Sequence, residues 1–326
     1  MSIPDYEYPV EQCDVPKIRR ASLTQYRVFR KKCLEYMRGD TSTSVMNQVQ
    51  DLAWHTVVFR TLNEARRLEP CRAVNGAMWE LIAAGYANLM TLGIRRLVDK
   101  DCRTDSVWNV IVEVEKRPEL LTREKFVCHD GLPYDYEAVY RKYVASLDMS
   151  SGGHFGYVST RGPDAWETSD HMHRTFDALC GYPSKRKRTD VIDASLLSKL
   201  KAALSDPSVK AVCTLADRRM AHAERLSDES HALPKVTYND IDDALKTIVR
   251  VANFLSSHFF YDAAFGSVVA APQFNVLESL DQSWVTTENL PVLHQYWYDI
   301  SNSMDQWAYD TDQGFLPPRP ASNKDS

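Results

Sequence analysis

The sequence predicts an all-α protein: a helical bundle with an up-and-down core and additional helices at both ends. Long segments repeat their apolar residues with the 3.6-residue period of an amphipathic helix. Few segments alternate apolar and polar residues over the length of a strand. Only 12 of the 326 residues are glycine, and the one Asn-Gly turn dipeptide, Asn75-Gly76, lies between helical patterns.

The individual helices follow from this periodicity and from capping residues. Thr104 or Asp105, Asp190 and Thr237 each precede an apolar run and are residue types that cap helix N-termini. Pro118 and Pro183 end helices because proline cannot continue the hydrogen-bond ladder. The predicted helices span residues 19–38, 43–68, 73–99, 105–116, 135–147, 165–181, 191–205, 208–227, 238–261 and 290–306.

Length and composition indicate a globular protein with one principal domain. Apolar residues make up 44% of the chain and charged residues 25%, enough for a sizeable core. The formal charge of −5 does not favour broad, nonspecific nucleic-acid binding, which needs a basic face. We expect an N-terminal extension and helix (1–40), a helical bundle (41–262), a C-terminal helical extension packing on it (263–310) and a disordered tail (311–326).

The cysteines and the N-terminus indicate a cytoplasmic protein. The seven cysteines are scattered, and none forms a Cys-x-x-Cys pair. This spacing argues against both a disulfide framework and a cysteine-rich zinc site, and a reducing compartment fits it best. The N-terminus has no apolar stretch typical of a signal peptide, and no run approaches the ~18 apolar residues that a membrane span needs.

Two predicted helices each carry an arginine within an apolar stripe. In 73–99, one stripe consists of Val74, Met78, Leu81, Ile82, Gly85, Leu89, Leu92 and Gly93. Arg96 continues this stripe, and Asp99 lies at its edge. In 208–227, Arg219 lies within the stripe and His222 at its edge. A buried guanidinium is costly unless it is paired, so each arginine requires a carboxylate, a carbonyl, water or a phosphate opposite it. Arg219 facing Asp99 would satisfy this requirement structurally, without any function.

Three segments resemble motifs of one family. The segment Leu215-Ala216-Asp217-Arg218-Arg219-Met220-Ala221-His222-Ala223-Glu224 is similar to a signature helix of the HEPN superfamily (higher eukaryotes and prokaryotes nucleotide-binding), in its abortive-infection branch. Leu92-Gly93-Ile94-Arg95-Arg96-Leu97-Val98-Asp99-Lys100 and Leu52-Ala53-Trp54-His55-Thr56-Val57-Val58-Phe59 resemble further pieces. The resemblance covers roughly residues 40–260.

The resemblance implies a helical bundle that dimerises and cuts RNA without a metal or other cofactor. His222 would act as acid and base on the ribose 2′-hydroxyl and the leaving oxygen. Arg218 and Arg219, with Arg95 and Arg96 from the other helix, would stabilise charge on the phosphate. In the family, a gap of about four to six residues separates an arginine from the histidine that follows it. Leu215, Ala216 and Asp217 occupy that position here, so the sequence departs from the pattern.

Two functions from different classes therefore remain open. One is a metal-independent ribonuclease of a prokaryotic defence or toxin–antitoxin system, with an antitoxin or other protein as a further partner. The other is a catalytically silent helical module that binds a nucleotide, RNA or a protein and mainly dimerises. The retained His222 favours the first, and the missing arginine favours the second.

Other side-chain groups have less specific patterns. Asp170, His171, His173 and Asp177 are candidate metal ligands, and His173 and Asp177 share a helix face, as a metal site would need, although an exposed polar helix start is the simpler interpretation. The basic cluster 185–188 is predicted to be a solvated loop, and the glycine-rich segment 149–163 a loop without phosphate-loop context. His55 and His258, within apolar helices, are predicted to be hydrogen-bonded core residues. The C-terminal aromatics are predicted to cover the core or a dimer partner.

Overall fold

The computed structural model confirms the all-α fold. It describes residues 5–68, 75–147, 158–221, 234–262, 267–269, 271–279, 282 and 287–309, with residues 219–221 described by their backbone alone. In this part of the chain the only β-type pairing is an isolated antiparallel bridge between Thr122 and Val191. The contacts divide the chain into two units, Met1–Ala271 and Pro272–Ser326. The domain boundaries given above remain predictions.

Every predicted helical segment contains a helix. The α-helices are α1 (Arg20–Arg38), α2 (Val45–Leu68), α3 (Gly76–Leu97), α4 (Val107–Glu115), α5 (Arg123–Cys128), α6 (Tyr136–Ser146), α7 (Trp166–Leu179), α8 (Ala194–Ala203), α9 (Pro207–Leu215), α10 (Tyr238–Phe254) and α11 (Leu290–Tyr309). Two π-helices extend α-helices: η4 (Ala216–Ala221) after α9 and η6 (Leu255–Phe259) after α10. Short 3₁₀ turns are η1 (Val10–Gln12), η2 (Lys17–Arg19), η3 (Pro118–Leu120) and η7 (Thr287–Asn289).

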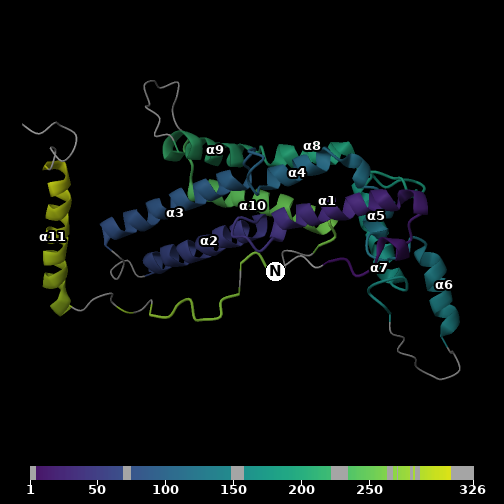
Figure 1. The fold of residues 1–326 in the computed structure, drawn as a ribbon. Coiled ribbons are helices and arrows are strands. Elements are labelled where there is room, and N and C mark those ends of the chain that lie inside the picture. The colour runs from purple at the N-terminus through teal and green to yellow at the C-terminus, as the bar shows by residue number, and fades with distance from the viewer. Residues whose placement is uncertain are drawn as a thin grey trace, which may run out of the picture. The chain divides into compact units, whose positions relative to one another are not determined.

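Four helices form the centre of the first unit. α2 and α3 lie side by side, and α9 and α10 pack against α3 (Figure 1). α1 contacts α2 and α4, and α7 contacts α5, α6 and η6. One apolar core runs through these elements with the exception of α6, and Tyr26, Phe29, Phe126, Phe176 and Phe259 are almost completely buried in it. Burial of this apolar surface is the main force holding the bundle together.

Side-chain caps fix several helix starts. Thr237 and Asp240 form a reciprocal capping box at the start of α10, as the sequence indicated. Ser106, rather than Thr104 or Asp105, caps α4. The predicted start of a helix at Val191 is wrong: Asp193 caps α8, whereas Asp190 accepts hydrogen bonds from Arg123 and the Lys187 amide.

The predicted core face of α3 is also wrong. Leu81 is 74% exposed, and Met78, Gly85, Leu89, Leu92 and Arg96 of the same predicted stripe are also exposed, whereas Ile82 and Gly93 are half-buried. The face that packs inward carries Tyr86, Met90, Ile94 and Leu97. α3 is apolar on both faces, so its periodicity does not decide which face meets the core. The ring of Tyr86 stacks on the ring of Phe59 in α2, and this contact turns the Tyr86 face of α3 towards the core.

A layer of charged residues is buried beside α5. Arg123 is 0% exposed; it pairs with Asp177 at 2.8 Å and Asp190 at 2.9 Å and donates to the His173 carbonyl. The next residue, Glu124, is also buried and pairs with Arg19 and Arg188. Each charge therefore has the partners that burial requires.

The basic cluster 185–188 belongs partly to this layer, so its assignment as a solvated loop is wrong. Arg186 pairs with Asp177 at 2.7 Å, and Arg188 pairs with Glu124 and Asp14. Their guanidinium groups also lie over the rings of Tyr136 and Tyr134. These contacts hold the loop before α8 against α5 and α7.

Candidate functional site

The candidate site lies where the C-terminal end of α3 contacts η4. Arg95 reaches across this junction, with its Nε 2.8 Å from a carboxylate oxygen of Asp217. Its Nη1 lies 3.1 Å from Asp99, four residues further on and just beyond the C-terminal end of α3. All three side chains are partly exposed, so the network lies at the surface and not in the closed core predicted for the α3 arginine.

The loop between α3 and α4 fixes the position of Asp99. The Ser106 hydroxyl donates to the Asp99 carbonyl at 2.6 Å, and the Asp101 amide donates to its carboxylate at 3.1 Å. Partial burial acts to raise the pKa of Asp99, but the Asp101 amide and Arg95 outweigh it, and the pKa is lowered. For Arg95, partial burial is outweighed by its two carboxylate partners, which raise the pKa of the guanidinium.

The other predicted site residues differ in exposure and in how much of each the structure describes. Arg96 is exposed, so its predicted burial in the apolar stripe is wrong. Arg218 lies on η4, half-buried and engaged in further interactions. Arg219 is described by its backbone only, and His222 lies outside the described residues. Asp99 is paired with Arg95, and the predicted pairing of Asp99 with Arg219 stays a prediction because the Arg219 side chain is not among those described.

The π-helix is the local feature that distinguishes this region. α9 ends at Leu215, and the chain continues into η4, which carries Asp217, Arg218 and Arg219. A π-turn interrupts the regular ladder and is frequently found at functional sites. It also changes which residues share a face, because each residue advances less around the axis than in an α-helix. Positions that regular helical spacing places together are therefore displaced here.

The charge around the junction is locally basic in an acidic chain. Arg95, Arg96, Lys100 and Arg218 supply four positive charges, and Asp99 and Asp217 supply two negative ones. The difference, 4 − 2, is +2, whereas the whole chain carries −5. Lys100 is additionally held by its ammonium group, 4.3 Å from the centre of the Trp108 ring.

Asp217 is the residue whose role sequence reasoning missed. It is a potential source of repulsion for a phosphate, but in the structure Arg95 neutralises it. The partner lies 122 positions away, and no local pattern indicates such a pairing. The Arg95–Asp99 contact, by contrast, has the i,i+4 spacing of helical neighbours and was visible in the sequence.

The proposed metal ligands on α7 have other partners. His173 is buried; its Nε2 donates to the Tyr134 carbonyl, and burial lowers its pKa to about 4. Asp177 is paired with Arg123 and Arg186. Within the described ranges, no group of three or more histidine, cysteine or acidic side chains is arranged to hold a metal ion. The simpler interpretation, an exposed helix start, holds for His171, which is exposed, but not for His173, which is buried.

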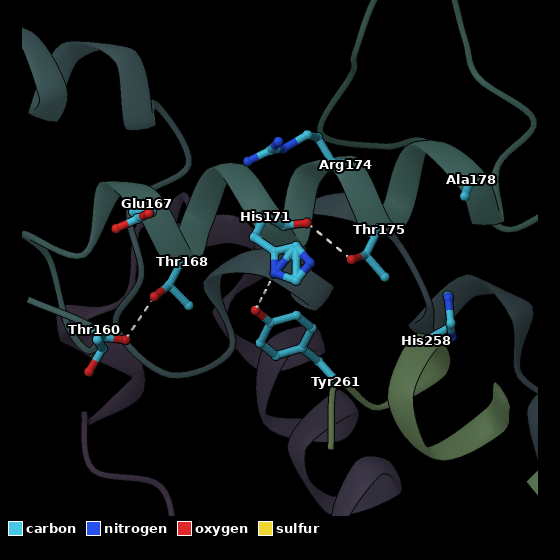
Figure 2. Close-up of a pocket in the computed structure, with 9 residues that line it drawn as sticks. All are labelled: Thr160, Glu167, Thr168, His171, Arg174, Thr175, Ala178, His258 and Tyr261. Atoms are coloured by element: carbon cyan, nitrogen blue, oxygen red, sulfur yellow. Dashed lines mark hydrogen bonds between the residues drawn. The ribbon is translucent and has the colours of Figure 1, made fainter. Parts of the chain in front are cut away.

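The two histidines predicted to lie in the core also differ from expectation. His55 is exposed on α2. His258 lies on η6, half-buried, and its ring hydrogen-bonds with the Ser257 hydroxyl. His258 lines a surface groove beside α7 (Figure 2).

Comparison with known proteins supports the resemblance. A family model of the HEPN type, described as AbiU2, matches residues 46–278, well over half of the chain. No curated protein and no solved structure matches the chain. In the described part, no helix is sufficiently long and apolar to cross a membrane. The match spans α2, α3, α9, η4 and α10, so this chain belongs to the AbiU2 family of HEPN-type abortive-infection helical domains.

Proposed function

We propose that this protein is an RNA-directed HEPN protein and that the junction of α3 with η4 binds the RNA phosphates. One observation carries the proposal: Arg95, near the end of α3, pairs with Asp217 of the π-helix that also carries Arg218, and the next residue of α3, Arg96, is exposed. Guanidinium groups donate several hydrogen bonds in a geometry that matches phosphate oxygens. The excess of two positive charges supplies the electrostatic attraction.

The proposed chemistry is metal-independent cleavage of RNA. His222 removes the proton of a ribose 2′-hydroxyl, which attacks the adjacent phosphorus and forms a 2′,3′-cyclic phosphate. The same histidine, once protonated, supplies a proton to the leaving 5′-oxygen. Arg218 and Arg219 stabilise the negative charge that builds up on the phosphorus centre. The family-spaced arginine is absent, so Arg96 from α3 supplies the additional positive charge.

A silent binding module is the competing proposal, and one observation favours it. Arg95 already has two carboxylate partners, Asp99 and Asp217, so its charge is neutralised without any ligand. In that case the junction holds α3 and η4 together, and RNA or a nucleotide is bound without being cut. The two proposals differ in cleavage and share RNA binding.

RNA binding is tested by reversing the two exposed or half-exposed charges beside the network. For Arg96→Glu combined with Arg218→Glu, we expect the Kd for a fluorescent single-stranded RNA to rise at least about tenfold at low salt, because each contact is charge-assisted. The slope of log Kd against log salt is expected to fall by about 0.7 for each lost contact. Fluorescence anisotropy across a salt series measures both quantities.

The matched control is Arg141→Glu, an exposed arginine on α6. It changes the net charge in the same direction but lies on a helix that does not contact α3 or η4. Equal weakening by both kinds of variant would mean that RNA is attracted only by the overall charge. RNA binding that survives the double reversal unchanged would remove the junction as the phosphate site.

We further propose that the exposed face of α3 forms a homodimer. Its large side chains, Met78, Leu81, Leu89 and Leu92, are apolar and exposed, and they lie along one side of the helix. A contiguous apolar surface of this kind is rare on monomers and marks an interface. Their spacing is symmetric about Gly85, because Leu81 and Leu89 lie four residues away on either side and Met78 and Leu92 lie seven.

This symmetry favours a second copy of the same helix as the partner. Two antiparallel α3 helices crossing at Gly85 would place Leu81 against Leu89 of the partner subunit, as an isologous two-fold contact requires. At 1.5 Å per residue, Arg96 lies about 17 Å from the crossing point, so the two copies of Arg96 are roughly 33 Å apart. Each α3–η4 junction would then consist of residues of one chain only, without a contribution from the partner subunit.

Gly85 provides a test of the dimer that separates association from folding. A Cβ added at Gly85 meets no atom within 4 Å, so Gly85→Gln has room in the monomer. Removing a glycine from a helix interior is expected to stabilise the monomer by about 0.5–1 kcal/mol. At the crossing point of a dimer, the same side chain prevents close approach. We expect analytical ultracentrifugation to show a dimer for the unmodified protein and a monomer for the variant.

A second substitution controls for solubility. Leu81→Lys is expected to dissociate the dimer, whereas Val28→Lys, at a 67% exposed site on α1, is not. A dimer that persists in both Gly85→Gln and Leu81→Lys would contradict the α3 interface.

The biological setting is proposed from the family alone. We infer a role in prokaryotic defence, in a toxin–antitoxin or abortive-infection arrangement in which a second protein restrains the activity. Six cysteines in the described ranges are all free thiols, which supports the reducing cytoplasm predicted from their spacing.

A further inference from the structure

A small pocket lies beside α5 and shares no residue with the groove beside α7 or with the α3–η4 junction. Arg19 lines it from η2, Ser22 from α1, Lys125 from α5 and Thr189 from the loop before α8. Its volume is about 60 Å³. A water molecule needs only ~10–15 Å³, whereas pockets for drug-sized ligands reach ~300–1,000 Å³. The pocket therefore has room for one small polyatomic group and not for a whole nucleotide.

Backbone and side-chain contacts hold the three segments around this pocket together. The Glu124 amide donates to the Arg188 carbonyl at 3.1 Å, and the bridge between Thr122 and Val191 continues this pairing. The Glu124 carboxylate is buried and lies 2.7 Å from Nε of Arg19, so it ties the start of α1 to α5. These contacts order the pocket before a ligand arrives, and binding therefore costs little conformational entropy.

The charged side chains that line the pocket are mostly positive. Arg19, Lys125 and Arg188 contribute three positive charges, and Glu124 contributes one negative charge. The difference, 3 − 1, is +2. Asp14 lies outside the lining but pairs with Arg188 at 3.1 Å, which reduces the excess to +1. The pocket therefore disfavours a cationic ligand and favours an anion.

Lys125 is the least compensated of these charges. It is 7% exposed, and its ammonium group donates to the Ser22 hydroxyl at 3.0 Å and to the Glu119 carbonyl at 2.5 Å. Among the residues that the structure describes, no carboxylate forms an ion pair with it. Burial lowers the pKa of Lys125, and the charges of Glu119 and Glu124 only partly oppose this effect. A buried ammonium without a counterion is unfavourable, and an anion in the pocket would supply one.

The unused hydrogen-bonding groups of the lining are mainly donors. Lys125 keeps a third N–H, and Nη1 of Arg19 donates to no described residue. Ser22 accepts from Lys125 and keeps its own proton for a further partner. The Thr189 hydroxyl is likewise unbonded within the described ranges. Both oxygens of Glu124, in contrast, are already engaged by guanidinium groups.

We propose that this pocket binds a phosphate group. A phosphate presents several acceptor oxygens and supplies the negative charge that Lys125 lacks. The pocket volume corresponds to a sphere of only about 2.4 Å radius, so side chains from different walls contact the same small ligand. An ammonium group or a metal cation would instead meet three positive side chains. This proposal is independent of RNA binding at the α3–η4 junction.

A phosphate group reaches the pocket from two sources: free inorganic phosphate or the end of a phosphate monoester. Thr189 is exposed, so the pocket opens to the surface and the ester part of a monoester stays outside. Inorganic phosphate and uridine 5′-monophosphate therefore serve as separate probes, with uridine and acetate as blanks. At about pH 7.5, above the second pKa of a phosphate monoester, the monoester probe carries nearly two negative charges.

The test is isothermal titration calorimetry of the full chain with each probe. For Lys125→Met, which keeps an unbranched side chain and loses the ammonium group, the Kd for inorganic phosphate is expected to rise at least about tenfold. Lys142→Met, at an exposed site on α6, changes the net charge equally and should leave the Kd unchanged.

A second variant avoids the buried lysine. Thr189→Val removes an exposed hydroxyl, and the Kd is expected to rise about two- to tenfold because one hydrogen bond is lost. Thr24→Val, at an exposed site on α1, is its control. Weakening by Thr189→Val is required of both probes, because uridine 5′-monophosphate has a second possible site at the α3–η4 junction.

Urea denaturation gives an independent readout and shows whether each variant is folded. A ligand that binds only the folded chain stabilises it by mass action. The urea midpoint of the unmodified protein is therefore expected to rise with the phosphate concentration. The midpoint of Lys125→Met should stay constant over the same concentrations.

The order of affinities identifies the source of the phosphate group. Tighter binding of uridine 5′-monophosphate than of inorganic phosphate supports a monoester as the ligand, and the reverse order supports free phosphate. Acetate that binds as tightly as phosphate would overturn the proposal. Equal weakening by Lys125→Met and Lys142→Met would overturn it as well, because the anion would then sense only the overall charge. So would a urea midpoint of the unmodified protein that does not respond to phosphate.

Discussion

Replacing Arg123 with alanine is expected to lower the free energy of unfolding by about 3–5 kcal/mol, a large part of the stability of a typical domain. Arg123 is fully buried, and its guanidinium holds Asp177, Asp190 and the His173 carbonyl together. Alanine leaves both carboxylates with reduced compensation and opens a cavity beneath Phe176, whose ring lies 5.1 Å from the guanidinium. Urea denaturation followed by circular dichroism measures the change.

Arg103→Ala provides the control for this substitution. Arg103 is also ion-paired, with Asp101, but its side chain is 84% exposed. Exposed pairs contribute little because water and salt screen them, so the denaturation midpoint should not move measurably. If Arg123→Ala lowered the free energy of unfolding as little as Arg103→Ala, water would have to enter the charged layer beside α5. That result would contradict the burial of these charges.

The helices were predictable because their determinants are local. Each helix needs only an apolar stripe and a cap, and both are contained in a short window of sequence. α10 is an example, since Thr237 and Asp240 form its capping box and its apolar residues fall on one face. α5 was missed because it has only six residues, too few to show a helical period.

The tertiary pairings were not predictable because their partners are far apart in the sequence. Arg123 meets Asp190 across 67 positions, and Arg95 meets Asp217 across 122. A charged run such as residues 185–188 looks the same whether it is solvated or paired, and only the fold brings Asp14, Glu124 and Asp177 to it. The inner face of α3 was misassigned for a related reason, because both of its faces are apolar.

The family motifs did not give the contacts between α3 and the signature helix. The sequence indicated Arg219 of the signature helix facing Asp99, whereas the contact that the structure describes joins Arg95 of α3 to Asp217. The residues are Arg95 with Asp99 and Asp217, and Arg96 is exposed. Regular helical geometry cannot give this result, because η4 is a π-helix and rotates its residues relative to an α-helix.

His222→Ala is expected to reduce RNA cleavage by about 10²–10⁴-fold, the usual contribution of general acid–base catalysis. The position of His222, one residue beyond η4, follows directly on the segment that Arg95 ties to α3 through Asp217. The measurement uses end-labelled RNA in EDTA, so that cleavage by contaminating metal-dependent nucleases is suppressed. Products of the unmodified protein should carry 2′,3′-cyclic phosphate ends, because the attacking group is the neighbouring 2′-hydroxyl.

His55→Ala is the matched control, because His55 is an exposed histidine on α2. It should leave the cleavage rate unchanged, and RNA binding by His222→Ala should stay close to that of the unmodified protein, since the arginines remain. Equal cleavage by the unmodified protein and His222→Ala would exclude His222 as the acid–base residue. If neither protein cuts RNA but both bind it, the ion pairs of Arg95 serve only to hold α3 and η4 together. The missing family-spaced arginine would then explain why the site does not cut RNA.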